Sequence, residues 1–245
     1  MRRHELTDHE RELLAPLIPR AVTGRPRAED PKIINGMVYK IRMGISWRDL
    51  PTRYGPWKTV YTRFRRYALD GVCTRALQQI QAQADEAGDI DWLVQIDSTI
   101  VRAHQHAAST ILITPGQRHD NVCAPPLLER IRVPRTGLGR PRCRPDRVIA
   151  DTAYSSRGFR AYLAAAASHT IPEKTDQQRH RLGRGRHGGR PPEFDRETYR
   201  RRNTVERCFN RLKGFCGLAT RYNKTAVSYE AAVTLASFLL WARSV

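Results

Sequence analysis

Two aspartates lie within or directly after apolar segments of the sequence, where burial of an unpaired carboxylate would cost free energy. Asp97 interrupts an apolar run, with Leu93-Val-Gln-Ile96 before it and Ile100-Val101 after it, whose composition is typical of a β-strand. Asp151 directly follows a second such run, Arg147-Val-Ile-Ala150. Buried carboxylates must be paired with a cation or bound to a metal. Because α/β sheets place ligand-binding groups at the carboxyl ends of their strands, these acids predict an oxygen-only site suited to Mg²⁺ or Mn²⁺.

A third acid lies on a helix that we predict from Arg196 to Gly214. On a continuous helix, turning about 100° per residue, one stripe of about 60° holds four functional side chains. They are Tyr199, Arg202, Glu206 and Lys213. Two cations and a phenol beside one carboxylate can bind a phosphodiester backbone while the carboxylate completes a metal site.

The three acids together predict phosphodiester chemistry. In-line attack on a phosphodiester needs an activated water or 3′-hydroxyl and a stabilised leaving oxygen, and two metal ions about 3.5–4 Å apart supply both. Asp97 alone would be explained better as a helix cap or an ion-pair partner. Combined with Asp151 and the stripe that carries Glu206, it favours catalysis.

The composition indicates a polyanionic partner. Among 245 residues, 43 are Lys or Arg and 24 are Asp or Glu, which gives a net charge of +19 and a pI near 10.6. Nucleic acid is the leading candidate, and the alternative is an arginine-rich composition without a binding role. The five cysteines contain no CxxC pair, which argues against a disulfide framework and fits a reducing cytosol.

No segment of the sequence has the properties of a membrane anchor. The first residues are polar where a signal peptide needs an apolar run. The apolar stretch from Tyr229 to Val245 contains Glu230 and Arg243, so we expect a buried terminal helix and no membrane partner.

Helical patterns extend from residue 5 to about residue 87. Thr7 is the predicted N-cap of the first helix, with Glu10 as its capping-box partner. A second helix is predicted from Asp30 to Met43, and a third begins after Pro56. The third helix carries four cations opposite an aromatic stripe, which suggests a helix-turn-helix-like reader of duplex DNA or, alternatively, a solvated basic face. These cations are Lys58, Arg63, Arg65 and Arg66.

From Trp92 onward strand patterns alternate with helical ones, which predicts an α/β domain. Further strands are expected at Thr110 to Thr114, at Arg147 to Ala150 and at His169 to Ile171. An alanine-rich helix from Arg157 to Ala167 should follow the cap Ser155-Ser156. We therefore expect a helical DNA-binding domain at 1–88 and a catalytic domain at 89–245.

Two basic stretches rich in proline and glycine interrupt the second domain. One runs from Arg132 to Arg147 and the other from Arg179 to Pro192. The segment 179–192 is too polar and glycine-rich to pack, so we expect a mobile surface segment that binds phosphates or has no binding role.

The sequence resembles the DDE transposases of bacterial insertion sequences, in the branch whose last acid lies in a Tyr-x₂-Arg-x₃-Glu-x₆-Lys signature. Tyr199, Arg202, Glu206 and Lys213 match that spacing in full. The segments IDSTIVRAHQHAA, TPGQRHD, ADTAYSS and RRNTVERCFNRLKGF are also similar to the family, as is the N-terminal GMVYKIRMGISWRDLPTRYGPW. The likeness covers nearly the whole chain.

The resemblance implies an RNase H-like fold in which Asp97, Asp151 and Glu206 are the catalytic residues and ligate two Mg²⁺ or Mn²⁺ ions. Tyr199, Arg202 and Lys213 would contact DNA at the transposon end. The implied reaction is metal-dependent hydrolysis at the terminal inverted repeats, followed by strand transfer into target DNA. A homodimer or larger synaptic complex on double-stranded DNA is also implied, because two ends must be joined.

The sequence departs from the family between the first two acids, where members have a longer, basic, glycine-containing stretch. Only Ala107-Ala-Ser109 separates His106 from the strand expected at Thr110. A further strand with its turn needs roughly 8–10 residues. We therefore expect an RNase H-like mixed sheet with one central strand missing, and an internally deleted copy with impaired catalysis.

Two other functions stay open at this point. A non-catalytic DNA-binding protein could occupy transposon ends and repress transposition. A related RNase H-like nuclease could cut RNA or structured DNA, and it would lack the preference of a transposase for one inverted repeat.

Overall fold

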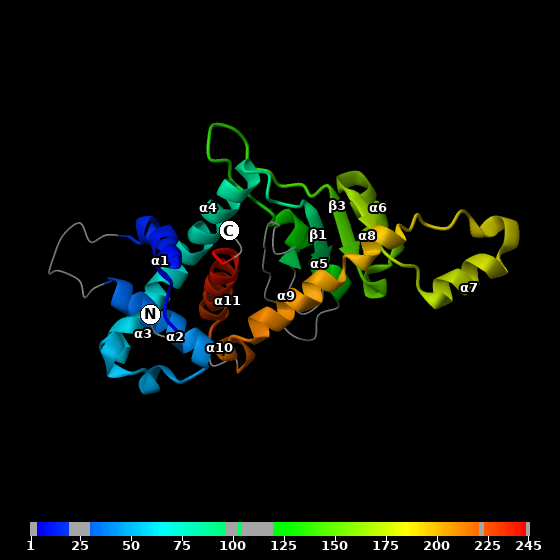
Figure 1. Cartoon of the computed structure of the whole chain (residues 1–245). Helices are drawn as coiled ribbons and strands as arrows, with labels where there is room; N and C mark the ends of the chain where they lie inside the picture. Colours follow the sequence, from blue (N-terminus) through cyan, green and yellow to red (C-terminus); the bar gives the residue numbers. More distant parts are fainter. Residues whose placement is uncertain (1–3, 20–29, 97–101, 104–119, 221–222, 244–245) are drawn as a thin grey trace. The chain divides into compact units, whose positions relative to one another are not determined.

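The chain folds into two compact units in a computed structural model (Figure 1). The structure describes residues 4–19, 30–96, 102–103, 120–220 and 223–243, without the side chains of 30, 102, 103, 120, 121, 204–206, 208 and 209. Unit 1 comprises Met1–Gln83 and Cys208–Val245, and unit 2 comprises Ala84–Arg207. Residues 208–245 therefore pack with the N-terminal helices.

Unit 1 is helical throughout its described residues. Its helices are α1 (Asp8–Leu14), α2 (Asp30–Met43), α3 (Trp57–Leu69), α4 (Val72–Glu86, ending in unit 2), α10 (Cys216–Ala219) and α11 (Ala226–Trp241), with 3₁₀ turns η1 (Ala15–Leu17), η2 (Trp47–Asp49) and η3 (Thr52–Tyr54). The predicted cap of the first helix is confirmed, because Thr7 accepts the Glu10 N–H and Glu10 accepts the Thr7 N–H. The predicted bounds of the second helix and the start of the third are confirmed as well.

The core of unit 1 follows the predicted helical stripes. On α2, Ile33, Ile34, Val38 and Ile41 are buried at helical spacing. The terminal helix α11 is apolar around its whole circumference and is buried, packing on α2 and α3, as expected from the sequence. Within the described part of the chain, no helix is long and apolar enough to span a lipid bilayer.

Unit 2 is built on a mixed sheet with the order β2-β1-β3-β4. Its strands are β1 (Leu93–Ile96), β2 (Arg102–Ala103), β3 (Arg147–Ala150) and β4 (Ser168–Thr170). β1, β3 and β4 are parallel, and β2 is antiparallel to β1. The predicted α/β class, with a mixed sheet, is thereby confirmed.

Helices and 3₁₀ turns complete unit 2. They are α5 (Asp120–Glu129), η4 (Thr152–Tyr154), α6 (Arg157–Ala166), α7 (Thr175–Gly183), η5 (Gly185–Gly188), α8 (Arg196–Arg200) and α9 (Asn203–Lys213, ending in unit 1). The helix α6 begins at the predicted cap, where Ser156 accepts the Phe159 N–H, and it connects the parallel strands β3 and β4.

One prediction about the elements needs correction. The single helix expected from Arg196 to Gly214 is broken into α8 and α9 by a turn at Arg201 and Arg202. Part of the segment 179–192, whose mobility stays a prediction, forms the end of α7 and η5, where Gly188 lies against the Arg181 carbonyl. That contact leaves no room for a side chain, which explains a glycine the sequence analysis assigned to mobility.

The strand expected at Thr110 to Thr114 lies outside the described residues, as does most of the stretch where we expect a strand to be missing. The described neighbour of β1 on that side is the two-residue strand β2. The missing strand therefore stays a prediction.

Candidate active site

The register of the parallel strands β1 and β3 defines the site. Leu93 pairs with Arg147, and the pairing continues to Ile96 and Ala150. The next residue in sequence after Ile96 is Asp97, and the next after Ala150 is Asp151. Each predicted acid thus directly follows the last paired residue of its strand.

Asp151 is the one of the three acids whose side chain the structure describes. It is half-buried, and one carboxylate oxygen accepts the backbone N–H of Ala153 at 2.9 Å, which caps the 3₁₀ turn η4. Asp151 therefore caps a 3₁₀ turn, a structural role that the sequence analysis considered only for Asp97. A carboxylate has about four lone-pair sites, so one cap bond leaves capacity to bind a cation.

Asp97 lies outside the described residues, and so does the side chain of Glu206, whose backbone belongs to α9. In the described part of the chain, no three His, Cys, Asp or Glu side chains lie close enough to hold a metal ion. Asp151 belongs to that part of the chain, whereas the side chains of its two predicted partners do not.

Gln95 on β1 contacts the turn between α8 and α9. Its side-chain amide is buried and donates a hydrogen bond to the Arg201 carbonyl at 2.9 Å. Arg201 also forms an ion pair with Asp91, just before β1. The Oε1 atom of Gln95 is buried without a hydrogen-bond partner among the described residues.

The other end of α8 is bound to β3. Arg147 donates hydrogen bonds to Asp195 at 2.7 Å and to the Thr198 hydroxyl at 2.8 Å. Asp195 is the N-cap of α8 and accepts the N–H groups of Glu197 and Thr198, each at 3.0 Å. Hydrogen bonds from the Thr198 hydroxyl and its N–H, followed by Arg147, lower the pKa of Asp195 to about 2.

These contacts explain why the predicted helix is broken. The Arg201 carbonyl accepts from Gln95, and the N–H groups of Arg201 and Arg202 bond three residues back, to Thr198 and Tyr199, as in a 3₁₀ turn. The signature residues therefore do not share one continuous helical face.

Tyr199 and Arg202 nevertheless lie together. The Arg202 guanidinium donates to the Tyr199 hydroxyl at 2.8 Å and lies 5.7 Å from the ring centre. The Tyr199 ring also contacts Phe194, with ring centres 5.1 Å apart. The predicted pair is thus held in place by local contacts.

The remaining predicted DNA-binding residues lie in unit 1. Lys213 is exposed at the end of α9, and Lys58, Arg65 and Arg66 are exposed on α3, where Arg63 is half-buried. Arg66 lies 3.7 Å from Asp70 in an exposed ion pair. The helix and the exposure agree with the prediction, while a DNA contact remains a prediction.

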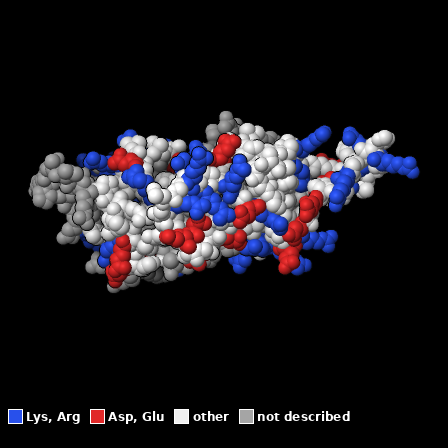
Figure 2. All heavy atoms as spheres, turned by 90° about the horizontal axis from the view of Figure 1, so that it is seen from above, with Lys and Arg blue, Asp and Glu red and all other residues white. Residues whose placement is uncertain are grey.

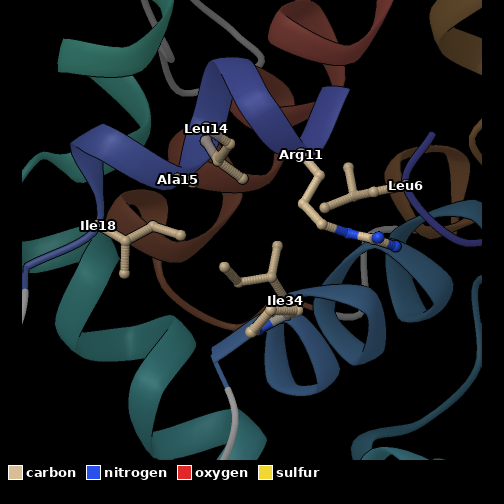
Figure 3. Close-up of a pocket in the computed structure, with 7 residues that line it drawn as sticks. Leu6, Arg11, Leu14, Ala15, Ile18 and Ile34 are labelled. Atoms are coloured by element: carbon tan, nitrogen blue, oxygen red, sulfur yellow. The ribbon is translucent and has the colours of Figure 1, made fainter. Parts of the chain in front are cut away.

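A cavity of about 180 Å³ in unit 1 is a poor candidate for chemistry (Figure 3). It is lined by Leu14 of α1, Ile34 of α2, Leu6 before α1 and Ile18 after η1, together with Ala15, Pro31 and Arg11. The Arg11 guanidinium donates to Asp8. Apolar walls without an acid or nucleophile favour packing over catalysis.

The sequence analysis missed the residues that position α8: Asp91, Gln95, Arg147, Asp195 and Arg201. Gln95 had a detectable signal, because a glutamine within a four-residue strand that is buried throughout must find a partner. The arginines with a structural role could not be distinguished in the sequence, because the chain contains so many basic residues.

Two family models match the chain, one on each side of the boundary predicted near residue 88. The model of a family described as "Transposase DDE domain" matches residues 91–241. A family described as "Putative transposase of IS4/5 family" matches residues 6–77. The first match covers more than half of the chain and includes all three predicted acids.

Two curated proteins are similar over part of the chain. "Uncharacterized protein y4sN" of Sinorhizobium fredii is 37% identical over 105 residues, which are 42% of this chain and 80% of that protein. "Putative transposase for insertion sequence element IS6501" of Brucella ovis is 30% identical over 130 residues, 53% of this chain and 85% of that protein. No solved structure matches the chain.

Proposed function

Because this chain belongs to the DDE transposase family of the IS4/5 type, which implies an RNase H-like fold, we propose that it cleaves DNA at the ends of an insertion sequence. The proposed second step is transfer of the freed strand into target DNA. Both steps would depend on divalent metal ions, Mg²⁺ or Mn²⁺, with two ions bound by Asp97, Asp151 and Glu206.

The observation that carries the proposal is the pairing of Ile96 with Ala150. Neighbouring strands lie about 4.8 Å apart. Two aspartates that each directly follow one of these paired residues are therefore well suited to share a cation. The second supporting contact is the Gln95 bond to Arg201, because it ties β1 to the turn that leads into α9 and Glu206.

The donor set fits a hard divalent ion. Asp151 offers carboxylate oxygens at a strand end, with one of them oriented by the Ala153 N–H. When bound, a pair of such ions would activate the attacking oxygen and stabilise the leaving oxygen. The role of the three acids is to hold that charge in place without neutralising it.

The cations have separate roles in this proposal. Tyr199 and Arg202, which are hydrogen-bonded to each other, would contact DNA at the transposon end, as would Lys213. Four cations of α3 would bind the duplex backbone: the exposed Lys58, Arg65 and Arg66 and the half-buried Arg63. The partners would be the terminal inverted repeats and target DNA, bound by a homodimer or larger synaptic complex.

Replacement of Asp151 by asparagine tests the proposal. Asparagine retains the cap bond to Ala153, so folding should be preserved while the ligand charge is lost. We expect Asp151→Asn to abolish cutting of a labelled duplex that carries the terminal repeat, in Mg²⁺ or Mn²⁺, without weakening DNA binding. The matched control is Asp176→Asn on α7, an exposed aspartate whose carboxylate also accepts a backbone N–H, and it should cut normally.

Unchanged cutting by Asp151→Asn would overturn the catalytic assignment. Binding of the repeat by the unmodified chain without any divalent-ion-dependent cutting would instead favour the alternative, a non-catalytic protein that occupies transposon ends and represses transposition. Preference for RNA over the terminal repeat would favour the nuclease.

The same assay tests whether this copy is impaired. We propose that a deletion between Asp97 and Asp151 removed a central strand, which is supported by the three residues that separate His106 from the strand expected at Thr110, where a strand with its turn needs roughly 8–10. Cutting should then be slow, and robust cutting by the unmodified chain would reject the deletion.

A further inference from the structure

The basic stretch that begins at Arg132 forms a hairpin that the proposed function leaves unexplained. Val133 and Arg142 form an antiparallel bridge, with N–H to carbonyl distances of 3.0 and 2.9 Å in the two directions. Residues 134–141 project beyond this bridge as a loop, drawn in green in Figure 1. We call residues 133–142 the basic hairpin.

The base of the hairpin is fixed to unit 2. Val133 is fully buried, and the Arg142 guanidinium lies 4.0 Å from the centre of the Trp92 ring. Arg142 also forms ion pairs with Asp146 at 2.7 Å and with Asp85 at 3.9 Å. A buried strand residue and a stacked, paired arginine hold the base in a defined position.

The tip of the hairpin is entirely exposed and carries uncompensated charge. Arg135 and Arg140 are exposed, as are Arg132 and Arg144 that flank the hairpin. Within the described residues, none of these four arginines has a carboxylate at ion-pair distance, whereas Arg142 and Arg147 do. The Arg135 guanidinium donates to the Arg140 carbonyl, which closes the tip.

In the sequence, a fully exposed leucine, Leu138, lies between Arg135 and Arg140. Leu138 is the most exposed large apolar side chain among the described residues, at 106% of its reference exposure. Glycines flank it on both sides, and Gly139 has a φ of +142°, a conformation that other residues rarely adopt. Single exposed leucines are common, but this one lies at the tip of a cationic hairpin whose base is fixed, with no neighbouring side chain to shield it.

We propose that the basic hairpin is a DNA-bending element, in which Arg135 and Arg140 bind phosphates on duplex DNA and Leu138 enters between adjacent base pairs. Apolar wedges flanked by cations are the means by which proteins unstack a base step and kink a duplex. Figure 2 shows Lys and Arg side chains interspersed with Asp and Glu side chains on the face of the molecule seen from above. The inference rests on the proposed function in taking duplex DNA as the occupant.

Fluorescence of 2-aminopurine tests the wedge. The probe is a duplex with the terminal repeat in which single adenines are replaced by 2-aminopurine, whose emission rises when it is unstacked. The full chain should raise the emission at one step, and Leu138→Ala should abolish that rise. Leu182→Ala on α7 is the matched control, since Leu182 is also exposed, at 71%, and it should leave the rise unchanged.

Salt dependence tests the arginines. Each phosphate contact contributes about −0.9 to the slope of log K against log salt, so Arg135→Gln/Arg140→Gln should make the slope shallower by about 2. The control Arg75→Gln/Arg157→Gln removes the same charge from exposed positions elsewhere and should leave the slope unchanged. All variants alter exposed side chains, so unchanged melting temperatures verify that they fold.

The outcomes separate this inference from the proposed function, because both binding assays are run in EDTA, without cutting. A rise that persists in Leu138→Ala, or an equal change of slope in the control double variant, would overturn the hairpin inference. Cutting without any rise would overturn it too and leave the proposed function standing. A Leu138-dependent rise in a chain that never cuts would support the hairpin and contradict the catalytic proposal.

Discussion

The carboxylate of Asp195 is strongly stabilised in its charged form. Thr198 and Arg147 lower its pKa to about 2, against an ordinary value of 3.8. A lowered pKa means that the contribution to stability is present above pH 3.8 and is lost as the pH falls towards 2.

We therefore expect Asp195→Asn to lower the free energy of unfolding near neutral pH, because the charged bond to Arg147 is lost while the cap of α8 is retained. The difference from the unmodified chain should shrink between about pH 4 and about pH 2. Urea unfolding over this range measures it. A difference that does not change with pH would show that the charge of Asp195 contributes nothing.

At the scale of single residues, the sequence predicted those contacts whose two partners lie close together in the chain. Thr7 and Glu10 form the expected capping box because both partners lie within one helical turn. The role of Gln95 was missed because its partner, the Arg201 carbonyl, is more than a hundred residues away in the sequence. The spacing of Tyr199, Arg202, Glu206 and Lys213 matched the family signature although the continuous helix assumed for it was wrong.

Among the elements, the turn between α8 and α9 depends on one side chain of β1. Gln95→Leu removes the hydrogen bond to Arg201, and it also removes the unpartnered Oε1 atom. The two effects on stability oppose each other, so we expect a change within about 1 kcal/mol. Cutting should fall by up to about 100-fold, because an error of about 1 Å in placing Glu206 is enough for such a loss.

A structural effect alone is excluded by comparison with Val148→Ala on β3, a buried residue of the same sheet that makes no contact with this turn among the described interactions. That variant should lose more stability and keep its cutting rate. If both variants cut equally well at equal DNA affinity, Gln95 is not a positioning residue.

The packing of α10 on α2 requires a glycine. A Cβ atom at Gly217 would lie 2.7 Å from the Ile41 carbonyl oxygen and 3.0 Å from the Lys40 carbonyl oxygen. Because both neighbours are backbone atoms, Gly217→Ala must separate the helices, and we expect a loss of about 1–3 kcal/mol.

Thermal unfolding of Gly217→Ala measures this loss, with Gly158→Ala as the control. Gly158 lies on α6 with no atom within 4 Å of an added Cβ, so alanine there should stabilise the chain by about 0.5–1 kcal/mol. An unchanged or raised melting temperature for Gly217→Ala would contradict the close approach of α10 to α2.

On the scale of the elements, periodicity predicted α2, α3, α6 and α11 because each is amphipathic or apolar over several turns. It did not predict α5, which contains Pro125 and Pro126, residues that normally end a helix. The order β2-β1-β3-β4 was not deducible either, since strand pairing depends on contacts between segments far apart in the sequence.

At the scale of the whole molecule, little in the sequence indicated that the C-terminal residues belong to unit 1. The sequence changes from helical to alternating patterns near residue 88, which suggested one boundary. The chain instead returns to the N-terminal helices after Arg207. A terminal helix that is apolar on all sides, such as α11, must be buried, but its sequence does not say against which partner.

Glu10 links the two ends of the chain. Its carboxylate is fully buried, accepts the Thr7 N–H at 2.8 Å, and forms ion pairs with Arg42 at 3.4 Å and with Arg243 at 3.0 Å. Burial and the nearby charge of Arg243 lower the pKa of Arg42, while Glu10 opposes that shift. The carboxylate is thus the group that makes the burial of Arg42 tolerable.

Glu10→Ala should therefore destabilise unit 1 by about 3–5 kcal/mol, because it leaves a buried arginine without its counter-charge. Arg243→Ala should cost at most about 1 kcal/mol, since the Arg243 side chain is 45% exposed and its pair is partly screened by water. Unfolding in urea, followed by the fluorescence of Trp47 and Trp57 with the other tryptophans replaced by phenylalanine, compares the two variants. Equal losses would mean that the pair with Arg243 accounts for the whole effect of Glu10, and they would contradict the role of Glu10 as the counter-charge of Arg42.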